Sequence, residues 1–224
     1  MCGFISVRKS VRWLPDVASE PTSTIVLTSP QRQFVDLRIL KDENGSIEGE
    51  NLPFSRLDWA IAGTSSSTTC TIDGKQVSRS QFVHWIDSRT STPENATDEG
   101  DMYPQPDGTT IEKGHMVNPD TGIVTAYEEV WDDKDVPSTD EAQVCVVLKY
   151  ENGDDKGMVV KLGKYCQGFM KIGEQMSLER WEWTVRTIQM GTEELPSKLV
   201  MERKFILGED VEVAGRSWKV VEIA

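Results

Sequence analysis

The stretch RLDWAIAGTSSSTTCTIDG, residues 56–74, poses a choice between a phosphate-binding loop and a long β-strand. A phosphate-binding loop needs a glycine-rich turn, a lysine and a following helix. Here Gly63 is followed by six hydroxyl-bearing residues, and the segment ends at Asp73-Gly74, a dipeptide typical of a tight β-hairpin. We therefore predict a strand, with Gly63 at a bulge or corner.

Strand patterns continue on both sides of this hairpin. Runs such as STIVLTS (23–29) and QFVDLRIL (33–40) are rich in β-branched residues, and the residues around 214–216 mark a second tight hairpin. Only 78–87 and 193–204 are compatible with a helix, and both are short. The pattern predicts an all-β protein with two antiparallel β-barrel-like (lipocalin-like) domains and few short helices.

Two polar segments indicate how the chain is divided. Residues 131–142 are acidic, contain a proline and have no apolar period, which is typical of a connector. We expect an N-terminal barrel-like domain over 1–133, an acidic connector over 134–141 and a C-terminal barrel-like domain over 142–224. Residues 88–108 are expected to form a polar insertion, either mobile or folded over the surface.

The N-terminal segment MCGFISVRKSVRWLP is basic, as mitochondrial presequences are, but its pattern is that of a half-buried strand. Apolar residues recur with period two, and polar residues occupy the opposite face. The apolar set is Ile5, Val7, Val11 and Trp13, and the polar set is Ser6, Arg8, Ser10 and Arg12. Only Lys9 breaks the alternation.

The formal net charge of −13 is concentrated in the middle of the chain. Residues 86–155 hold 18 acidic and 4 basic side chains, and the remaining residues together come to +1. This distribution disfavours nucleic acid and anionic membranes, and it suits a basic partner or simple solubility. No apolar run is long enough to cross a bilayer, so we expect no membrane insertion.

The chain holds little material for a metal or cofactor site. Its four cysteines, Cys2, Cys70, Cys145 and Cys166, are far apart, and it has two histidines. A Cys/His zinc site is therefore not expected, and we expect no metal and no cofactor. Free cysteines in strand-like surroundings favour a reducing compartment.

No catalytic centre stands out, and we expect neither a catalytic residue nor an enzymatic activity. His84 lies between apolar residues and is interpreted as a hydrogen-bonded imidazole in the core or at an interface. Glu128 and Glu129 are adjacent on a strand, so they face opposite sides and cannot act on one bond. One of them could point into a barrel, where it would need a partner or a raised pKa. His84 and Glu129 would be the best candidates in an enzyme of a new kind.

The aromatic residues permit two interpretations. They can fill a small barrel, or they can line a cavity for a small apolar ligand, as in lipocalins. We favour the filled core, because small barrels are usually packed solid. The candidate ligand-binding residues in the barrel interior are Trp59, Trp85, Tyr127, Glu129, Trp131, Trp181 and Trp183.

Four hydroxyl residues in polar stretches follow an acidic residue by three positions, a spacing that kinases of the casein-kinase-one type favour. Matches of this kind also arise by chance in a chain with 37 acidic residues. The candidate phosphoacceptors are Ser19, Ser23, Thr97 and Ser138.

Three segments, LPFSRLDWAIAGT (52–64), YEEVW (127–131) and VVLKYENGDDKGMVVKLGKYCQGFM (146–170), together resemble the fungal HRI protein family. The C-terminal hairpin GRSWKVVEIA (215–224) is also similar. Glycines and aromatic residues at such places specify a fold more than a chemistry. The matching residues are Trp59, Ala60, Ala62, Gly63, Thr64, Glu129, Trp131, Gly157, Gly163, Gln167, Gly168 and Phe169.

The resemblance implies two β-barrel-like domains, a cytoplasmic and nuclear location and no established catalytic activity. It also implies a link to a casein-kinase-one-type kinase and to a subunit of the endoplasmic reticulum translocation machinery.

We therefore expect a non-enzymatic interaction partner or client of a casein-kinase-one-type kinase, with the acidic middle, residues 86–155, as its docking or phosphorylated element. The alternative is a lipocalin-like carrier of a small apolar ligand. Exposed edge strands would also permit a homodimer.

Overall fold

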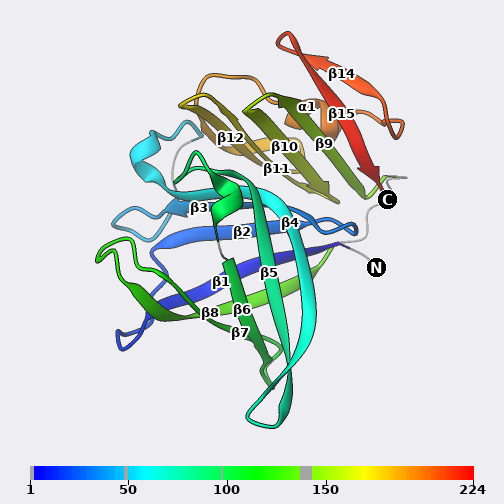
Figure 1. The fold of residues 1–224 in the computed structure, drawn as a ribbon. Coiled ribbons are helices and arrows are strands. Elements are labelled where there is room, and N and C mark those ends of the chain that lie inside the picture. Colours follow the sequence, from blue (N-terminus) through cyan, green and yellow to red (C-terminus); the bar gives the residue numbers. More distant parts are fainter. Residues whose placement is uncertain (1–2, 48–49, 97, 137–142) are drawn as a thin grey trace.

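The computed structural model describes residues 3–47, 50–96, 98–136 and 143–224. Eight strands close into a barrel, and seven more form a second sheet that lies along one side of the barrel (Figure 1). The prediction of an all-β, barrel-like fold is confirmed.

The barrel is a meander in which each strand pairs antiparallel with the next, and β8 pairs with β1 to close the ring. Because the ring is closed, every barrel strand has a neighbour on both sides and presents no edge. Two 3-10 turns, η1 (Phe54–Arg56) and η2 (Pro93–Asn95), lie in its loops. Its strands are β1 (Phe4–Trp13), β2 (Thr22–Thr28), β3 (Gln33–Leu40), β4 (Leu57–Ile72), β5 (Lys75–Asp87), β6 (Asp98–Pro104), β7 (Thr110–Val117) and β8 (Val124–Asp135).

β4 is the long strand predicted from residues 56–74. Its pairing with β5 shifts register between Ala62 and Gly63, so Gly63 lies at a bulge, as expected. A Cβ atom at Gly63 would lie 2.0 Å from the carbonyl oxygen of Val83, a distance that no side chain tolerates. The hairpin to β5 turns at Asp73 and Gly74, whose φ angles of 49° and 76° suit the predicted tight turn.

β1 is the predicted N-terminal strand, but its apolar residues do not share one face. Its pairing with β8 shifts register at Lys9, and one extra residue reverses the alternation beyond it. Ile5 and Val7 pack outside the barrel against the second sheet, whereas Val11 and Trp13 line the interior. The single apolar face predicted for this segment is therefore wrong.

The region 88–108 is not an insertion, because it supplies β6, one of the eight barrel strands. β6 lacks an apolar pattern because its inward residues are Asp98, Gly100 and Met102. The short stretch 78–87, which was compatible with a helix, lies in β5.

The second half of the chain forms a seven-stranded antiparallel sheet in the order β13-β12-β11-β10-β9-β15-β14. Among the described residues its end strands do not pair with each other, so this half is an open sheet rather than a closed barrel. It buries both faces without closing, because the barrel covers one face and the segment around α1 (Ser197–Glu202) covers the other. Its strands are β9 (Cys145–Asn152), β10 (Asp155–Leu162), β11 (Tyr165–Ile172), β12 (Gln175–Glu182), β13 (Val185–Met190), β14 (Asp210–Val213) and β15 (Arg216–Ile223).

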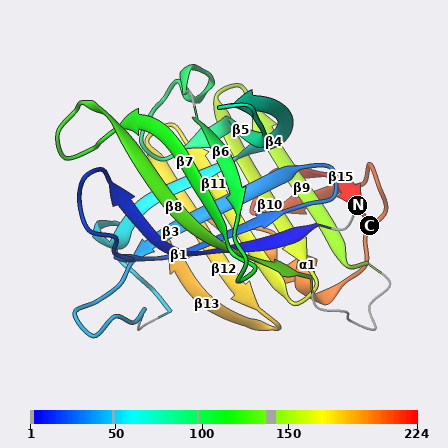
Figure 2. The same ribbon diagram turned by 90° about the horizontal axis from the view of Figure 1, so that it is seen from below.

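The chain passes from barrel to sheet between β8, which ends at Asp135, and β9, which begins at Cys145. The last barrel strand thus extends two residues beyond the predicted domain end at 133. Residues 137–142, most of the predicted connector, lie outside the described residues. Seen from below, the barrel strands cross over those of the sheet (Figure 2).

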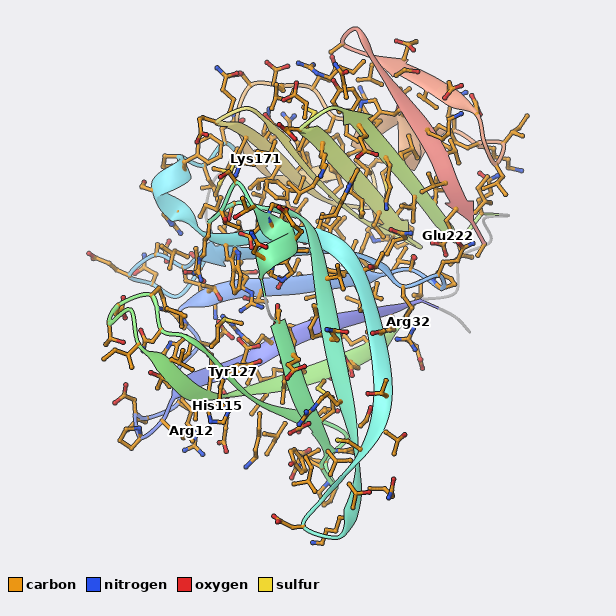
Figure 3. The ribbon with its side chains drawn as sticks, in the orientation of Figure 1. Arg12, Arg32, His115, Tyr127, Lys171 and Glu222 are labelled. Carbon is orange, nitrogen blue, oxygen red and sulfur yellow. The ribbon has the colours of Figure 1, made fainter. Side chains whose placement is uncertain are left out.

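Polar contacts hold the two ends of the interface between barrel and sheet (Figure 3). At one end, the carboxylate of Glu222 on β15 accepts hydrogen bonds from the Ser29 hydroxyl and the backbone N–H of Gln31 in the β2–β3 turn, at 2.5 and 2.9 Å. At the other, Lys171 on β11 donates to the carbonyl oxygens of Asp87 and Thr90, at 3.1 and 2.7 Å. These contacts fix the sheet on the barrel at both ends.

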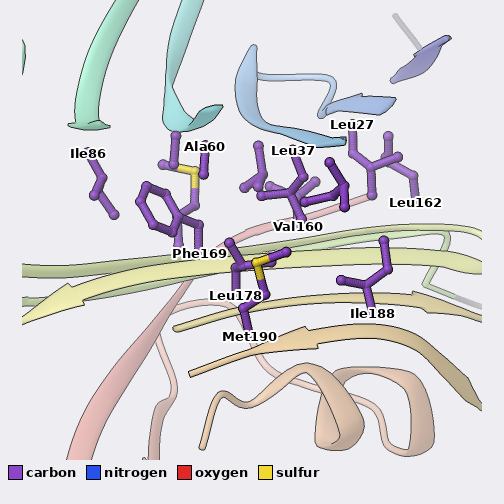
Figure 4. Close-up of a cluster of buried hydrophobic side chains, with 14 of the residues drawn as sticks. Leu27, Leu37, Ala60, Ile86, Val160, Leu162, Phe169, Leu178, Ile188 and Met190 are labelled. Carbon is purple, nitrogen blue, oxygen red and sulfur yellow. The ribbon is translucent and has the colours of Figure 1, made fainter. Parts of the chain in front are cut away.

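An apolar layer fills the space between them (Figure 4). Leu37 of β3 and its alternate neighbours point out of the barrel into this layer, where they meet Val160 and Phe169 of the sheet. The residues between them on β3, Asp36 and Arg38, point into the barrel instead. One face of β3 packs in the apolar layer and the other lines the barrel interior. This explains why the strand QFVDLRIL is apolar at alternate positions and carries charged residues between them.

Two buried polar side chains of the sheet cross this layer. The Gln167 amide donates to the carbonyl oxygens of Ile25 and Val35, each at 2.9 Å. Arg180 donates to the side-chain oxygen of Gln167 at 2.8 Å and to the carbonyl oxygen of Leu37 at 2.9 Å. Burial lowers the pKa of Arg180 to about 10. Since these donors need acceptors at set positions, they specify one placement of the sheet on the barrel.

Substitution of Gly63 by alanine is expected to destabilise the protein by about 2 kcal/mol or more, because the new methyl group would collide with the Val83 carbonyl oxygen. Urea unfolding measures the change in the free energy of unfolding. Thr64→Ala, at the exposed neighbouring position, is the matched control and should change it by less than about 0.5 kcal/mol. Equal stability of the two variants would contradict the bulge.

Candidate functional site

The barrel encloses a cavity of about 370 Å³. Residues from all eight barrel strands line it, and the lining reaches exposed residues in the loops, among them Pro21, Pro119 and Asp120. The β1–β2 and β7–β8 loops lie side by side at that end of the barrel, where the Leu14 amide donates to the Ala126 carbonyl oxygen at 2.9 Å (Figure 1). The preference for a filled barrel core is therefore wrong.

One part of the cavity wall is apolar. Phe34 and Phe82 meet edge to face with ring centroids 5.7 Å apart. They belong to one buried cluster together with Val26, Trp59, Ile61, Met116 and Trp131. Such a wall suits the apolar body of a small molecule.

A chain of buried charges forms another part. The carboxylate of Glu129 accepts hydrogen bonds from Arg8 at 2.5 Å and from Arg38 at 3.1 Å, and Arg38 also donates to Asp36 at 2.9 Å. Glu20 pairs with the far side of Arg8 at 2.9 Å. Burial raises the pKa of Asp36 even though Arg38 and Arg8 favour its charged form. Each arginine is held by carboxylates, which offsets much of the penalty for removing these charges from water.

Glu112 on β7 is the second buried carboxyl group of interest. It accepts hydrogen bonds from the Tyr127 hydroxyl and from the Trp131 indole, both at 2.9 Å. Burial, with smaller contributions from Glu129 and Asp98, raises the pKa of Glu112 to about 8. The group therefore carries a proton at neutral pH and can offer a hydrogen-bond donor in the cavity.

A glycine pair makes room for this arrangement. Gly100 and Gly114 face each other on β6 and β7. A Cβ atom at Gly114 would lie 2.5 Å from the Tyr127 hydroxyl, and one at Gly100 would lie 2.4 Å from the Glu112 side chain. The absence of both side chains leaves room for the ring of Tyr127, which is labelled in Figure 3 and whose hydroxyl donates to Glu112.

His84 is buried beside the cavity between two carboxylates. Its Nδ1 lies 2.9 Å from Asp87 and its Nε2 lies 3.0 Å from Asp98. Burial alone would lower the pKa of His84, but the two carboxylates outweigh it and raise the pKa to about 9. Asp87 also accepts the Trp59 indole N–H at 2.8 Å. The interpretation of His84 as a hydrogen-bonded core imidazole is confirmed, and both ring nitrogens are occupied.

Four of the predicted ligand-binding residues do line the cavity, namely Trp59, Tyr127, Glu129 and Trp131. Glu129 points inward, whereas its neighbour Glu128 lies outside and pairs with Lys113 at 2.7 Å. Strand alternation thus separated these two carboxylates as predicted.

The other three lie outside the barrel interior, so their assignment to it is wrong. Trp85 is turned toward the sheet, where Lys149 lies 4.6 Å from its ring centroid. Trp181 is buried on the far face of the sheet, and its indole donates to Glu179 at 2.8 Å. Trp183 is 57% exposed in the β12–β13 turn. Trp85 is on the outward face of the barrel strand β5, which packs on the sheet. Trp181 and Trp183 were misplaced because the second half does not enclose an interior of its own.

Sequence reasoning missed most of the charged residues that line the cavity, among them Arg8, Asp36, Arg38 and Glu112. The available signal was a charged residue at every second position of an otherwise apolar strand, as Asp36 and Arg38 show within β3. The sequence alone does not say which face of such a strand points into the barrel. The second sheet decides this, because it covers the opposite face.

The candidate phosphoacceptors differ in their surroundings. Ser19 is exposed between β1 and β2, and its backbone pairs with that of Val11. Ser23 lies within β2, and its hydroxyl accepts a hydrogen bond from Arg180 at 3.0 Å. Thr97 and Ser138 lie outside the described residues.

In the described part of the chain, no group of three or more His, Cys, Asp and Glu residues is placed to hold a metal ion. Cys70, Cys145 and Cys166 are free thiols, and burial raises the pKa of Cys145 to about 12. In the same residues, no helix is long and apolar enough to span a membrane.

Replacement of His84 by glutamine is expected to flatten the pH dependence of stability. Its pKa is higher in the folded state, so the stabilisation is present below 6.5, the ordinary value, and is lost as the pH rises through about 9. The loss is on the order of 3 kcal/mol, which urea unfolding at the two ends of this window measures. His115→Gln, at the other histidine, is exposed and should keep the wild-type slope. The same slope in His84→Gln would contradict the assignment.

Comparisons with known proteins agree with this architecture. A search among curated proteins found no match. A solved structure described as an uncharacterized protein, YLR301w from Saccharomyces cerevisiae, has the same fold, with a TM-score of 0.77 and 16% identity over 100% of both chains. The family model described as Protein HRI1 matches residues 4–222, nearly the whole sequence. The chain therefore belongs to the HRI1 family.

Proposed function

We propose that this protein is a non-enzymatic binding protein that holds one small molecule inside its barrel. The observation that carries the proposal is the cavity of about 370 Å³. An eight-stranded barrel is wide enough either to be filled by its own side chains or to hold one small ligand, and sites for small molecules begin at about 300 Å³.

The charged groups in the cavity wall narrow the class of ligand that we expect. A purely apolar carrier site would not enclose the chain of charges from Arg8 to Asp36, because buried charges are unfavourable unless each has a partner. The cavity suits a molecule with an apolar body and at least one polar group.

The best catalytic candidates support a binding role. His84 contacts a carboxylate through each ring nitrogen, and Glu129 is paired with two arginines. His84 therefore has no free ring nitrogen with which to take a proton from a substrate.

The protein purified from its own organism is expected to carry a stoichiometric small-molecule adduct in native mass spectrometry. The adduct should leave on mild denaturation, because the closed barrel holds it. Met116→Trp, which adds volume inside the cavity, should retain the fold and lose the adduct. Val117→Trp, at the next position of β7 and 54% exposed, should keep it. A bare wild-type chain would contradict the proposal.

We also propose that the protein is a partner or client of a casein-kinase-one-type kinase. The observation that favours it is the exposed Ser19, three residues after Asp16. A kinase must draw its acceptor away from the fold, which is easier at Ser19, held by a single isolated bridge to Val11, than within the seven-residue strand β2 that holds Ser23. A link to the translocation machinery and a cytoplasmic and nuclear location rest on the resemblance, a homodimer rests on exposed edge strands, and all three remain predictions.

Incubation with such a kinase and ATP is expected to place phosphate on Ser19 and not on Ser23. Ser19→Ala should remove that phosphate from the peptide map, and Ser23→Ala should leave it unchanged. Phosphate that persists in Ser19→Ala at this peptide would exclude Ser19 as the acceptor.

A further inference from the structure

Two buried side-chain oxygens of the cavity lining, Ser65 Oγ and Asp36 Oδ1, lack a hydrogen-bond partner among the described residues, and only the second belongs to a carboxyl group. Asp36 on β3 is 3% exposed and lines the cavity, and its Oδ2 accepts the hydrogen bond from Arg38. Its Oδ1 is buried and has no hydrogen-bond partner among the described residues. A carboxylate oxygen can only accept, so the group that belongs there is a donor.

The charges of the wall favour a positively charged donor. Arg8 and Arg38 are paired with Glu129, and Arg89 is paired with Asp58 at 2.9 Å. With Glu112 protonated and Asp98 offset by the charged His84, five carboxylates of the lining still face four guanidinium groups, so the wall opposes an anion and favours a cation. The carboxyl groups of the lining are Asp36, Asp58, Asp98, Glu112, Asp120, Glu129 and Asp133, against the guanidinium groups of Arg8, Arg32, Arg38 and Arg89.

The surroundings of Asp36 are apolar apart from these charges. Val26 on β2 and Ile61 on β4 lie directly across from Asp36 in the two neighbouring strands. Phe34 is the preceding inward residue of β3. A ligand bound at Asp36 would therefore place its body against three apolar side chains.

We propose that the ligand is a small organic cation, a protonated amine whose ammonium group donates to Asp36 Oδ1 and whose apolar body lies against Val26, Phe34 and Ile61. This inference rests on the proposed function, that the cavity holds a small molecule, and it names the class of that molecule. A primary ammonium group has three donors, so it can satisfy Asp36 and still reach a further acceptor of the wall.

Three probes of similar size and different charge test the class: 2-phenylethylamine, 2-phenylethanol and 3-phenylpropionate. Isothermal titration in phosphate buffer, which contains no competing amine, measures their affinities at neutral pH. The amine should bind about tenfold or more tightly than the alcohol, as expected of a charge-assisted hydrogen bond, and the carboxylate should bind least.

Asp36→Asn keeps the size of the side chain and removes its charge. It should lower the affinity for the amine about tenfold and leave that for the alcohol unchanged. Asp132→Asn is the matched control, because Asp132 lies on β8, does not line the cavity and pairs with Lys9 at 3.0 Å. Circular dichroism checks that both variants fold. If Asp36→Asn does not fold, the ratio of the affinities of the wild-type protein for the amine and for the alcohol tests the proposal.

The outcomes separate this inference from the proposed function. If the alcohol or the carboxylate binds as tightly as the amine or more tightly, the proposal that the ligand is an amine is overturned. The proposal that the cavity binds a small molecule would then still stand. If no probe binds, the adduct from the native organism decides, since an amine supports the inference and any other compound overturns it. Failure of every probe together with a bare native chain would overturn both proposals.

Discussion

The packing of the seven-stranded sheet on the outer wall of the barrel is the constraint on which the rest of the structure depends. It assigns one face of β3 to a dry interface, where Leu37 meets Val160 and Phe169. Because strand residues alternate, the other face of β3 must then point into the barrel and carry Asp36 and Arg38 there. The content of the cavity follows from what covers the barrel from outside.

A barrel with charges inside must neutralise them without help from bulk water. Here Glu129 and Arg38 each form ion pairs with more than one partner. Glu129 accepts hydrogen bonds from both Arg8 and Arg38, and Arg38 donates to both Glu129 and Asp36. The same logic places His84 between Asp87 and Asp98. Such a network orients its side chains before any ligand binds, so a ligand meets a preorganised wall.

Local features were predictable because they depend on few residues. Gly63 was predicted at a bulge and lies at one, and Asp73-Gly74 forms the expected hairpin, since each requires a backbone geometry that few residues adopt. β6 was not predictable, because a strand between two barrel neighbours, with small and polar residues inside, needs no apolar period. Its pairing partners, and not its own composition, make it a strand.

The sequence by itself determined the all-β class, most strands, the tight hairpins and the opposite faces of Glu128 and Glu129. The tertiary structure alone decided which face of each strand is inside. A bulge at Lys9 turned Val11 and Trp13 inward. Trp85 lies on the outward face of β5, and the open second sheet left Trp181 and Trp183 outside the cavity. The physical reason is the period of two: a shift of one residue exchanges the faces, and only long-range pairing sets that register.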